Sequence, residues 1–266
     1  MASLSKVSSR DGTEIGYWSS GEGLPLVLVH GTASLHTTWN TVTPLLAEAM
    51  SVHAIDRRGR GASGDGDRYG VEREYEDVAA VVEAESARAG KPVVLVGHSF
   101  GGLCAFGTAT LTDKLDKLVL YEGWPVMGSS GPAADQIAVL LDDYLSGGDL
   151  DRLLETFLRE VVQLTDEQVS YFRSLPGWWE SRLGVAHTIP REFRVSVPLD
   201  RERAAAVTTP TMLLLGEVSV PELKAGYQEI ASALPNVRVQ VLKGQDHMAH
   251  LSDPEQFANQ VLDFIH

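Results

Sequence analysis

Short apolar runs bounded by turn residues recur along the chain and predict the strands of a buried sheet. The clearest are LVLVHG at 26–31 and VVLVGHS at 93–99, which are typical of strands covered on both faces. Four other runs have the same form, at 51–59, 117–123, 211–217 and 237–244. Helical stretches such as 72–89 and 221–234 separate most of them, and this alternation predicts a parallel sheet with crossover helices.

Two other stretches depart from this alternation. At the N-terminus, SLSKVSS and EIGYWSS flank the turn Asp11-Gly12, which predicts a hairpin at one edge of the sheet. Residues 124–200 show helical periodicity and no buried strand, with apolar faces such as Ile137, Leu140, Leu141 and Tyr144. We therefore predict a helical cap at 124–200, inserted into a core domain made of residues 1–123 and 201–266.

Composition and charge fit one large α/β unit carrying such an insertion. The chain has 266 residues, of which 44% are hydrophobic and 22% charged, so a large core is expected and disorder is not. Lys and Arg number 22 against 36 Asp and Glu, and 22 − 36 gives a formal charge of −14. This sign opposes binding to nucleic-acid phosphates or anionic lipid. We expect neither nucleic acid nor membrane as a partner.

Cysteine usage and the N-terminal segment indicate the compartment. Cys104 is the single cysteine, so no intrachain disulfide and no thiolate metal cluster can form. The first residues lack the apolar stretch of a signal peptide, and the longest apolar runs are too short to span a bilayer. We predict a cytoplasmic protein; the sequence carries no mark of its oligomeric state.

The segment GHSFGG at 97–102 holds the candidate nucleophile. It follows a predicted strand and precedes an apparent helix, the context required of a G-x-S-x-G nucleophile elbow. Ser99 would occupy a strained turn at the strand tip, where glycines remove side chains that would collide. The following helix would direct its N-terminal amides at an oxyanion. The alternative is a structural serine in a glycine turn.

Several motifs together resemble the α/β-hydrolase superfamily. HGT at 30–32 looks like its oxyanion turn, DRRGRGAS at 56–63 like its D-x-R-G-x-G-x-S turn, and GQDH at 244–247 like the G-x-x-H segment that carries the catalytic histidine. The resemblance covers nearly the whole chain outside the cap. It implies the α/β-hydrolase fold, with a mostly parallel eight-stranded sheet flanked by helices, and Ser99 as the nucleophile.

His247 is the candidate general base. A serine hydroxyl attacks at neutral pH only when an imidazole removes its proton, and His247 follows the last predicted strand in the Ser, acid, His order of the superfamily. His250, three residues on, is a local competitor. His98 directly precedes the nucleophile, and its side chain is expected to point away.

The triad acid is where the sequence departs from the commonest pattern of the superfamily. G-x-x-D after the seventh strand usually supplies an aspartate, but GEVS at 216–219 places Ser219 there. A serine cannot stabilise an imidazolium as a carboxylate does. The acid is therefore either missing or supplied from elsewhere.

Glu122 is the favoured acid. It ends the strand that follows the one carrying Ser99, and neighbouring parallel strands end about 4.8 Å apart at the same sheet edge. Certain haloalkane dehalogenases and lactone hydrolases of the superfamily place their acid after this strand. Glu217 is the second choice, Asp246 is badly placed to orient the adjacent ring of His247, and a solvated strand-end glutamate is the alternative for either glutamate.

The remaining candidate residues concern the oxyanion and the substrate. The backbone N–H groups of Thr32 and Phe100 are expected to form the oxyanion hole. His30 and three cap tryptophans are candidate substrate contacts: Trp124, Trp178 and Trp179. Aromatic residues between cap and sheet favour a small or medium, largely apolar substrate with a polar carbonyl, such as an ester, lactone or thioester.

Three weaker signals are discounted, so we expect no cofactor and no metal. The G-x-G-x-x-G match at 59–64 is followed by DGDRYG where a helix should begin. RRGRG at 57–61 stands in a chain of charge −14, which argues against RNA binding. Asp246, His247 and His250 lack the spacing of a metal site.

These observations favour a cofactor-free serine hydrolase acting on a carboxylic ester or lactone through an acyl-enzyme. A C–C bond hydrolase or cofactor-free lyase on the same triad is the alternative enzyme. Dehalogenases and epoxide hydrolases fit less well, because their nucleophile is an aspartate where this chain has Ser99. A binding protein without turnover is the alternative from another class, because fold alone does not establish chemistry.

Overall fold

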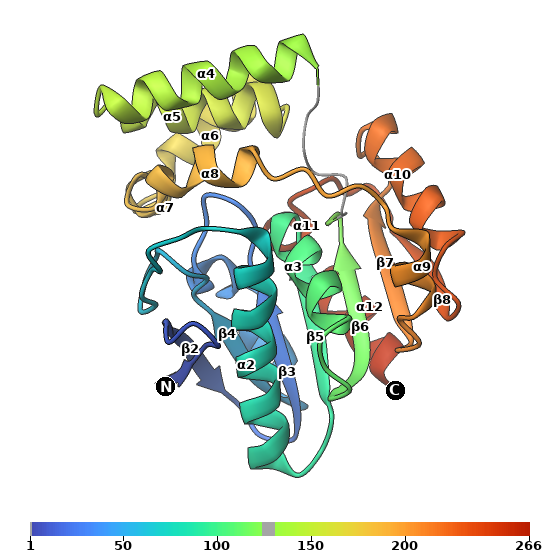
Figure 1. Ribbon diagram of the computed structural model, residues 1–266. Helices are drawn as coiled ribbons and strands as arrows, with labels where there is room; N and C mark the ends of the chain where they lie inside the picture. The colour runs from blue at the N-terminus through green and yellow to red at the C-terminus, as the bar shows by residue number, and fades with distance from the viewer. Residues whose placement is uncertain (1, 124–130) are drawn as a thin grey trace.

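The computed structural model describes residues 2–123 and 131–266, and its centre is one eight-stranded sheet (Figure 1). The strand order is β1-β2-β4-β3-β5-β6-β7-β8. The strands are β1 (Ser3–Ser8), β2 (Glu14–Ser20), β3 (Leu24–Val29), β4 (Met50–Ile55), β5 (Val93–His98), β6 (Leu115–Tyr121), β7 (Thr211–Gly216) and β8 (Val237–Leu242). The predicted α/β-hydrolase fold is confirmed.

Six of the strands are parallel, and the first two form the predicted hairpin. β1 pairs with β2 and β2 with β4 in antiparallel register, whereas β3 to β8 pair in parallel. Gly12 has φ +85° in the hairpin turn, and the Thr13 N–H donates to the Asp11 carboxylate at 3.0 Å. A glycine followed by this hydrogen bond fixes a tight turn.

Helices cover both faces of the sheet, and α2 and α10 form where the sequence predicts them at 72–89 and 221–234. The helices are η1 (His36–Trp39), α1 (Thr43–Leu46), α2 (Val71–Ala89), α3 (Phe100–Ala109), α4 (Pro132–Ser146), α5 (Leu150–Thr156), the π-helical turn η2 (Phe157–Val161), α6 (Asp166–Ser174), α7 (Trp178–Leu183), η3 (Ala186–Thr188), α8 (Ile189–Phe193), α9 (Arg201–Ala205), α10 (Pro221–Ala231), α11 (Ala249–Ser252) and α12 (Pro254–Ile265).

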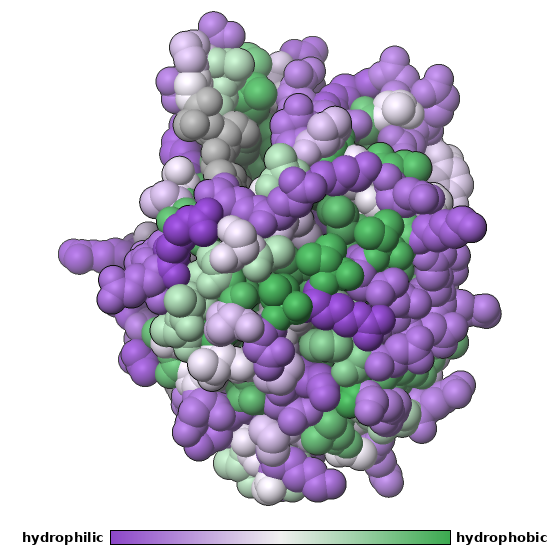
Figure 2. Space-filling model, turned by 90° about the vertical axis from the view of Figure 1, so that its right-hand side faces the viewer, coloured by the Kyte–Doolittle hydropathy of each residue, from purple (hydrophilic) through white to green (hydrophobic). Residues whose placement is uncertain are grey.

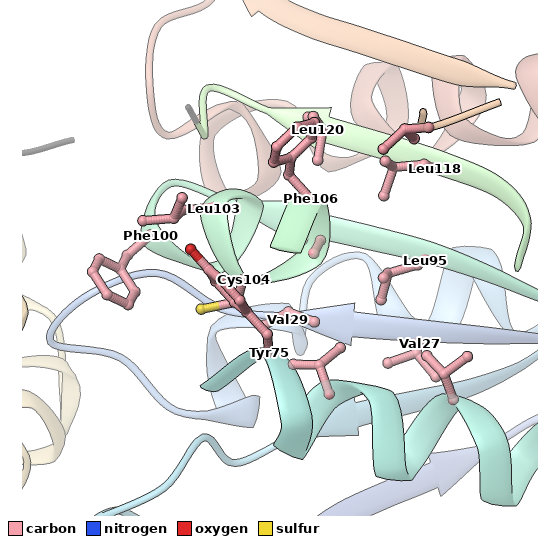
Figure 3. Packing of buried hydrophobic residues seen from close by; sticks show 14 of the residues in the cluster. Val27, Val29, Tyr75, Leu95, Phe100, Leu103, Cys104, Phe106, Leu118 and Leu120 are labelled. Atoms are coloured by element: carbon pink, nitrogen blue, oxygen red, sulfur yellow. The ribbon is translucent and has the colours of Figure 1, made fainter. Parts of the chain in front are cut away.

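The apolar runs of the central strands are buried because alternate side chains enter different layers. In β3, Val27 and Val29 pack with residues of α2 and α3, while Leu26 and Leu28 pack with residues of α1 and α12. Figure 3 shows the first layer, in which Cys104 and Phe106 of α3 pack in one cluster with side chains of the strands. Each fully buried aliphatic side chain contributes about 1.5–3 kcal/mol, and the layers hold the strand ends rigidly in place.

β8 differs from the prediction of a strand covered on both faces. It is the edge strand, and Val239 and Val241 are 49% and 46% exposed. Figure 2 views this side of the molecule and shows apolar side chains among mostly hydrophilic ones. The run at 237–244 alternates apolar and polar residues, but its apolar members Val239 and Val241 are exposed, so the alternation does not identify the covered face of this edge strand.

The helices α4 to α8 group together above the sheet (Figure 1) and have their own apolar cluster. Leu141, Leu153 and Leu154 are fully buried in it. Residues 131–200, the described part of the predicted cap, contain no strand. The division into a core domain and a cap domain at 124–200 stays a prediction. Among the described residues, no helix has the length and apolar character needed to cross a bilayer.

Candidate active site

Ser99 lies in a strained turn between β5 and α3. Its backbone has φ +53° and ψ −129°, a conformation that a residue with a side chain adopts only when its surroundings impose it. The Ser99 N–H donates to the Tyr121 carbonyl of β6 at 3.0 Å, and the first turn of α3 begins at Phe100. The strand, turn and helix of the sequence motif are therefore all present.

The glycines around Ser99 are required by close backbone contacts. A Cβ on Gly97 would lie 2.3 Å from the carbonyl oxygen of Gly101, and one on Gly101 would lie 2.3 Å from that of Val29. These distances are far below van der Waals contact. The spacing of the motif is thus a packing requirement of the turn, as we expect for a nucleophile elbow.

Glu122 and His247 face each other beside this turn. Glu122 follows β6 with φ +45°, and its side chain is fully buried. The His247 Nδ1 lies 2.9 Å from Glu122 Oε2, and the His247 side chain is 22% exposed. A carboxylate at Nδ1 fixes the tautomer in which Nε2 can accept a proton.

Ser99, Glu122 and His247 line the same cavity. The hydrogen bonds of the described residues do not include one between Ser99 Oγ and His247 Nε2. Such catalytic hydrogen bonds are often long until substrate binds. The structure therefore brings the three predicted residues together, and the carboxylate–imidazole half of the arrangement is already formed.

Ser219 takes part in this arrangement in a way that sequence reasoning did not anticipate. It occupies the position where the superfamily usually has an aspartate, and its hydroxyl donates a short hydrogen bond to Glu122 Oε1. The Gly216 N–H donates to the same oxygen at 2.7 Å. One carboxylate oxygen is thus held by β7 and the residues after it, while the other faces His247. The sequence signal for this contact was Ser219 itself, because its position after β7 lies beside the end of β6, where Glu122 follows.

Ser219 should act as a positioning residue for Glu122. We expect Ser219→Ala to lower kcat/KM by roughly 10-fold, because one donor to a buried charge is lost while the Gly216 N–H remains. Ser219→Thr keeps the hydroxyl and should restore most of the activity. Steady-state kinetics on one ester measures both variants. Equal losses in the two variants would show that the hydroxyl does not position the acid.

Tyr121 and His98 hold the loop that carries His247 through hydrogen bonds to its backbone. Tyr121 Oη donates to the Asp246 carbonyl at 2.6 Å and accepts from the Ala249 N–H at 2.8 Å. His98 Nε2 donates to the His247 carbonyl at 2.9 Å. Burial, reinforced by His250 and His247, holds the pKa of His98 well below its usual range, so the ring is a neutral support. His98 thus lies against the His247 loop, where sequence reasoning assigned it no role.

The competing residues have other partners. Glu217 Oε2 accepts from the Gly244 N–H at 2.8 Å, and Asp246 Oδ1 accepts from the Met248 N–H at 2.9 Å. His250 is fully buried with Nε2 3.3 Å from Thr38 Oγ1. The structure places Glu122 against the His247 ring and gives Glu217 and Asp246 backbone partners instead.

Thr32 and Phe100 lie in the cavity wall beside Ser99. Phe100 is the first residue of α3, where backbone N–H groups have no partner within the helix. Gly31 permits the close approach of the Thr32 loop, because a Cβ there would lie 2.9 Å from Ser99 Cβ. Thr32 and Phe100 therefore lie beside the nucleophile, where backbone donors to a tetrahedral oxyanion are expected.

The cavity has a volume of about 710 Å³ and lies between the sheet edge and the helices above it. The turn η2, the residues after it and α8 supply much of its apolar wall, and α10 supplies a further part. Apolar residues in the wall include Phe157, Val161, Val162, Leu164, Phe193 and Leu223. Volumes of this order suit small-molecule ligands.

The predicted substrate contacts lie in different surroundings, and not all of them line a cavity. Trp179 is 4% exposed, packs in the cap cluster and donates through Nε1 to Asp151 at 2.8 Å. His30 is fully buried, with Nδ1 donating to the Gly31 carbonyl and Nε2 accepting from the Arg57 N–H. Neither lines the cavity, because each is enclosed by its own hydrogen-bond partners. Trp178 lines a smaller pocket beside Ser99, and Trp124 lies outside the described residues.

The arginines of the segment at 57–61 are buried ion-pair partners. Arg57 donates to Glu74 at 3.0 and 2.8 Å and to Glu192 of α8 at 2.8 Å. Arg60 also pairs with Glu192. Burial alone would raise the pKa of Glu192, but these two guanidiniums lower it to about 2. The network ties the turn after β4 to α8. Among the described residues, no group of three or more His, Cys, Asp or Glu is placed to hold a metal ion.

A nucleophile elbow at the edge of a mostly parallel sheet defines a class of α/β enzymes. Comparison with known proteins identifies the family within that class. The profile of the Alpha/beta hydrolase family matches residues 26–260, and the chain belongs to that family. A solved structure of an alpha/beta hydrolase from Sphaerobacter thermophilus is 30% identical, with a TM-score of 0.86 over 98% of this chain and 100% of that one.

Two curated relatives extend the comparison. The pimeloyl-[acyl-carrier protein] methyl ester esterase of Photobacterium profundum is 25% identical over 95% of this chain and 99% of its own length. The 2-hydroxy-6-oxo-6-(2'-aminophenyl)hexa-2,4-dienoic acid hydrolase of Metapseudomonas resinovorans is 26% identical over 96% and 88%. The similarity to each extends over nearly the whole chain.

Proposed function

We propose that this protein is a serine hydrolase that cleaves a small to medium, largely apolar carboxylic ester or lactone through an acyl-enzyme. One observation carries the proposal: Ser99, His247 and Glu122 line one cavity, with His247 Nδ1 2.9 Å from Glu122 Oε2. Membership of the Alpha/beta hydrolase family and the similarity to an esterase support a hydrolase.

The residues divide the chemistry in the following way. His247 Nε2 takes the Ser99 hydroxyl proton as Oγ attacks the carbonyl carbon, and the Glu122 carboxylate stabilises the imidazolium. The Thr32 and Phe100 N–H groups donate to the oxyanion. The imidazolium then protonates the leaving alkoxide, and the acyl group stays on Ser99. Water, activated by His247, attacks the acyl-enzyme, releases the acid and restores the serine.

The cavity sets the size and polarity of the substrate. Its apolar wall, with Phe157 and Phe193 from the cap, suits an apolar substituent of the ester, while the oxyanion donors suit the carbonyl oxygen. The proposed cap domain at 124–200 would thus form the roof of the substrate site over the sheet edge. No cofactor takes part in these steps.

A fluorophosphonate tests whether Ser99 is an activated nucleophile, because such reagents label serines whose proton is removed by a base. We expect intact mass and peptide mapping to show one label on Ser99 in the wild type. His247→Ala should be labelled far more slowly, and Ser99→Ala not at all. A folded wild type that stays unlabelled would contradict the proposal and favour a binding protein without turnover. Labelling elsewhere would assign another nucleophile.

A further inference from the structure

A second, smaller pocket of about 50 Å³ lies beside the cavity and shares six of its lining residues. Ser99, Thr32 and His247 line both spaces. On its far side the small pocket is bounded by Trp178 and Arg182 of α7 and by His250 of α11. A group that occupies it would therefore lie within a few bonds of a carbonyl carbon at Ser99.

Arg182 is a buried cation without an anionic partner. It is 8% exposed, and no carboxylate of the described residues forms an ion pair with it. Its guanidinium stacks on the Trp178 ring at 3.5 Å, and Nη1 donates to the Trp178 carbonyl and the Ser181 hydroxyl. Among the described residues, the hydrogen bonds of this guanidinium are made by Nη1 alone, and Nε and Nη2 are not among the fully buried atoms without a partner. Burial lowers the pKa of Arg182 to about 9, so the group still carries its charge at neutral pH.

Two polar atoms belonging to residues of this pocket have no partner. Trp178 Nε1 and His250 Nδ1 are both buried without a hydrogen bond within the described chain. Buried polar groups are nearly always hydrogen bonded, so each exception calls for an explanation. The Trp178 indole can only donate. A cation and a donor that share one small pocket both require an acceptor, and a negatively charged one satisfies the cation best.

The two spaces also differ in the charge of their walls, and the difference favours an anion in the small pocket. The larger cavity has five acidic residues in its wall: Glu122, Glu192, Glu222, Glu229 and Asp246. The described wall of the small pocket has none. In a chain with a formal charge of −14, the small pocket is the part of this site where an anion meets no like charge at contact distance.

We propose that the small pocket binds a carboxylate of the substrate, held by the Arg182 guanidinium and the Trp178 Nε1–H. This proposal deepens the proposed function and rests on it: the substrate is an ester or lactone that carries a carboxylate a few bonds from the carbonyl carbon. The guanidinium fork matches a carboxylate and pairs with it through charge-assisted hydrogen bonds. The apolar part of the substrate occupies the larger cavity.

Matched pairs of methyl esters test the proposal. The monomethyl esters of malonate, succinate and glutarate are each compared with the methyl ester of the branched acid in which a terminal isopropyl group replaces the carboxylate. For the chain length that reaches the pocket, the wild type should have the higher kcat/KM on the charged ester. Arg182→Met should lower this selectivity ratio by roughly 10-fold to 100-fold, as expected for lost hydrogen bonds to a charge.

Arg173→Met is the matched control. Arg173 also stacks on a cap tryptophan, Trp179, at 3.8 Å, but it pairs with Asp151 and lines neither space. Its substitution should leave the selectivity ratio as it is in the wild type. Trp178→Phe keeps the aromatic ring and removes the donor, so it should lower the ratio by a smaller factor and serves if Arg182→Met does not fold. A ratio at or below one for all three lengths, or one that survives in Arg182→Met, would overturn the proposal.

Succinate binding separates this proposal from the proposed function. Calorimetric titration of Ser99→Ala with succinate requires no turnover. Binding that weakens at least 10-fold on adding Arg182→Met supports the pocket even if no ester is hydrolysed. If the wild type hydrolyses esters but has no selectivity for the charged ones, and Ser99→Ala does not bind succinate, the proposed function stands and the carboxylate pocket is rejected.

Discussion

Glu122→Gln is expected to lower kcat on an ester substrate by about 10,000-fold. An amide cannot stabilise the imidazolium that forms during attack, and it favours the wrong tautomer of the histidine it contacts; loss of a triad carboxylate in this way typically costs about four orders of magnitude. The side chain is fully buried, and His247 Nδ1 lies 2.9 Å from its Oε2. Steady-state kinetics on wild type and variant measures the effect.

Glu217→Gln is the matched control for this substitution. Glu217 was the second candidate for the triad acid, and its carboxylate instead accepts a hydrogen bond from the Gly244 N–H. The control should keep wild-type kcat within about twofold, as is usual for a change outside the site. A Glu122→Gln enzyme that retains a tenth or more of its activity would contradict the assignment of Glu122. A large loss in Glu217→Gln would transfer the role to that residue.

Arg57→Met is expected to lower the free energy of unfolding by about 3–5 kcal/mol. Removing one partner of a buried ion pair leaves the other charge uncompensated, which costs more than the pair contributes. Arg57 is 1% exposed and pairs with Glu74 and with Glu192 of the cap. Without it, Glu74 would lose its ion-pair partner, and Glu192 would keep only the guanidinium of Arg60.

Urea denaturation measures this loss of stability, and Arg73→Met is the matched control variant. Arg73 pairs with Glu76 at 2.7 Å on the surface of α2, where its side chain is 45% exposed. Exposed pairs of this kind contribute about 0–1 kcal/mol, so the control should unfold nearly as the wild type does. Equal shifts of the two variants would show that the buried network does not stabilise the protein.

The sequence was sufficient where a residue's place depends on backbone topology. Buried apolar runs predict the strands, and neighbouring parallel strands end side by side. Glu122 could therefore be predicted to lie near Ser99 and the histidine that acts on it, His247. The elbow glycines follow from the same logic, since contacts of 2.3 Å exclude any side chain at Gly97 or Gly101.

The sequence was insufficient where a residue's place depends on side-chain packing. Trp178 and Trp179 are adjacent in sequence, yet one lines a pocket and the other packs in the cap cluster. His30 belongs to a recognisable motif but is enclosed by backbone partners. The hydrogen bond from Ser219 to Glu122 joins residues 97 positions apart. Such outcomes depend on distances that no local pattern encodes.

The most direct measurement is the mass of the enzyme during turnover. A 4-nitrophenyl ester is mixed with the enzyme, the reaction is quenched with acid within the first turnovers, and the intact mass and Ser99 peptide are determined. We expect a mass increase equal to the acyl group less the hydroxyl hydrogen that it replaces, located on Ser99 and absent from Ser99→Ala, with one nitrophenol released per adduct before the first deacylation. An adduct on another residue, or a folded Ser99→Ala enzyme that hydrolyses the ester at the wild-type rate, would contradict an acyl-enzyme at Ser99.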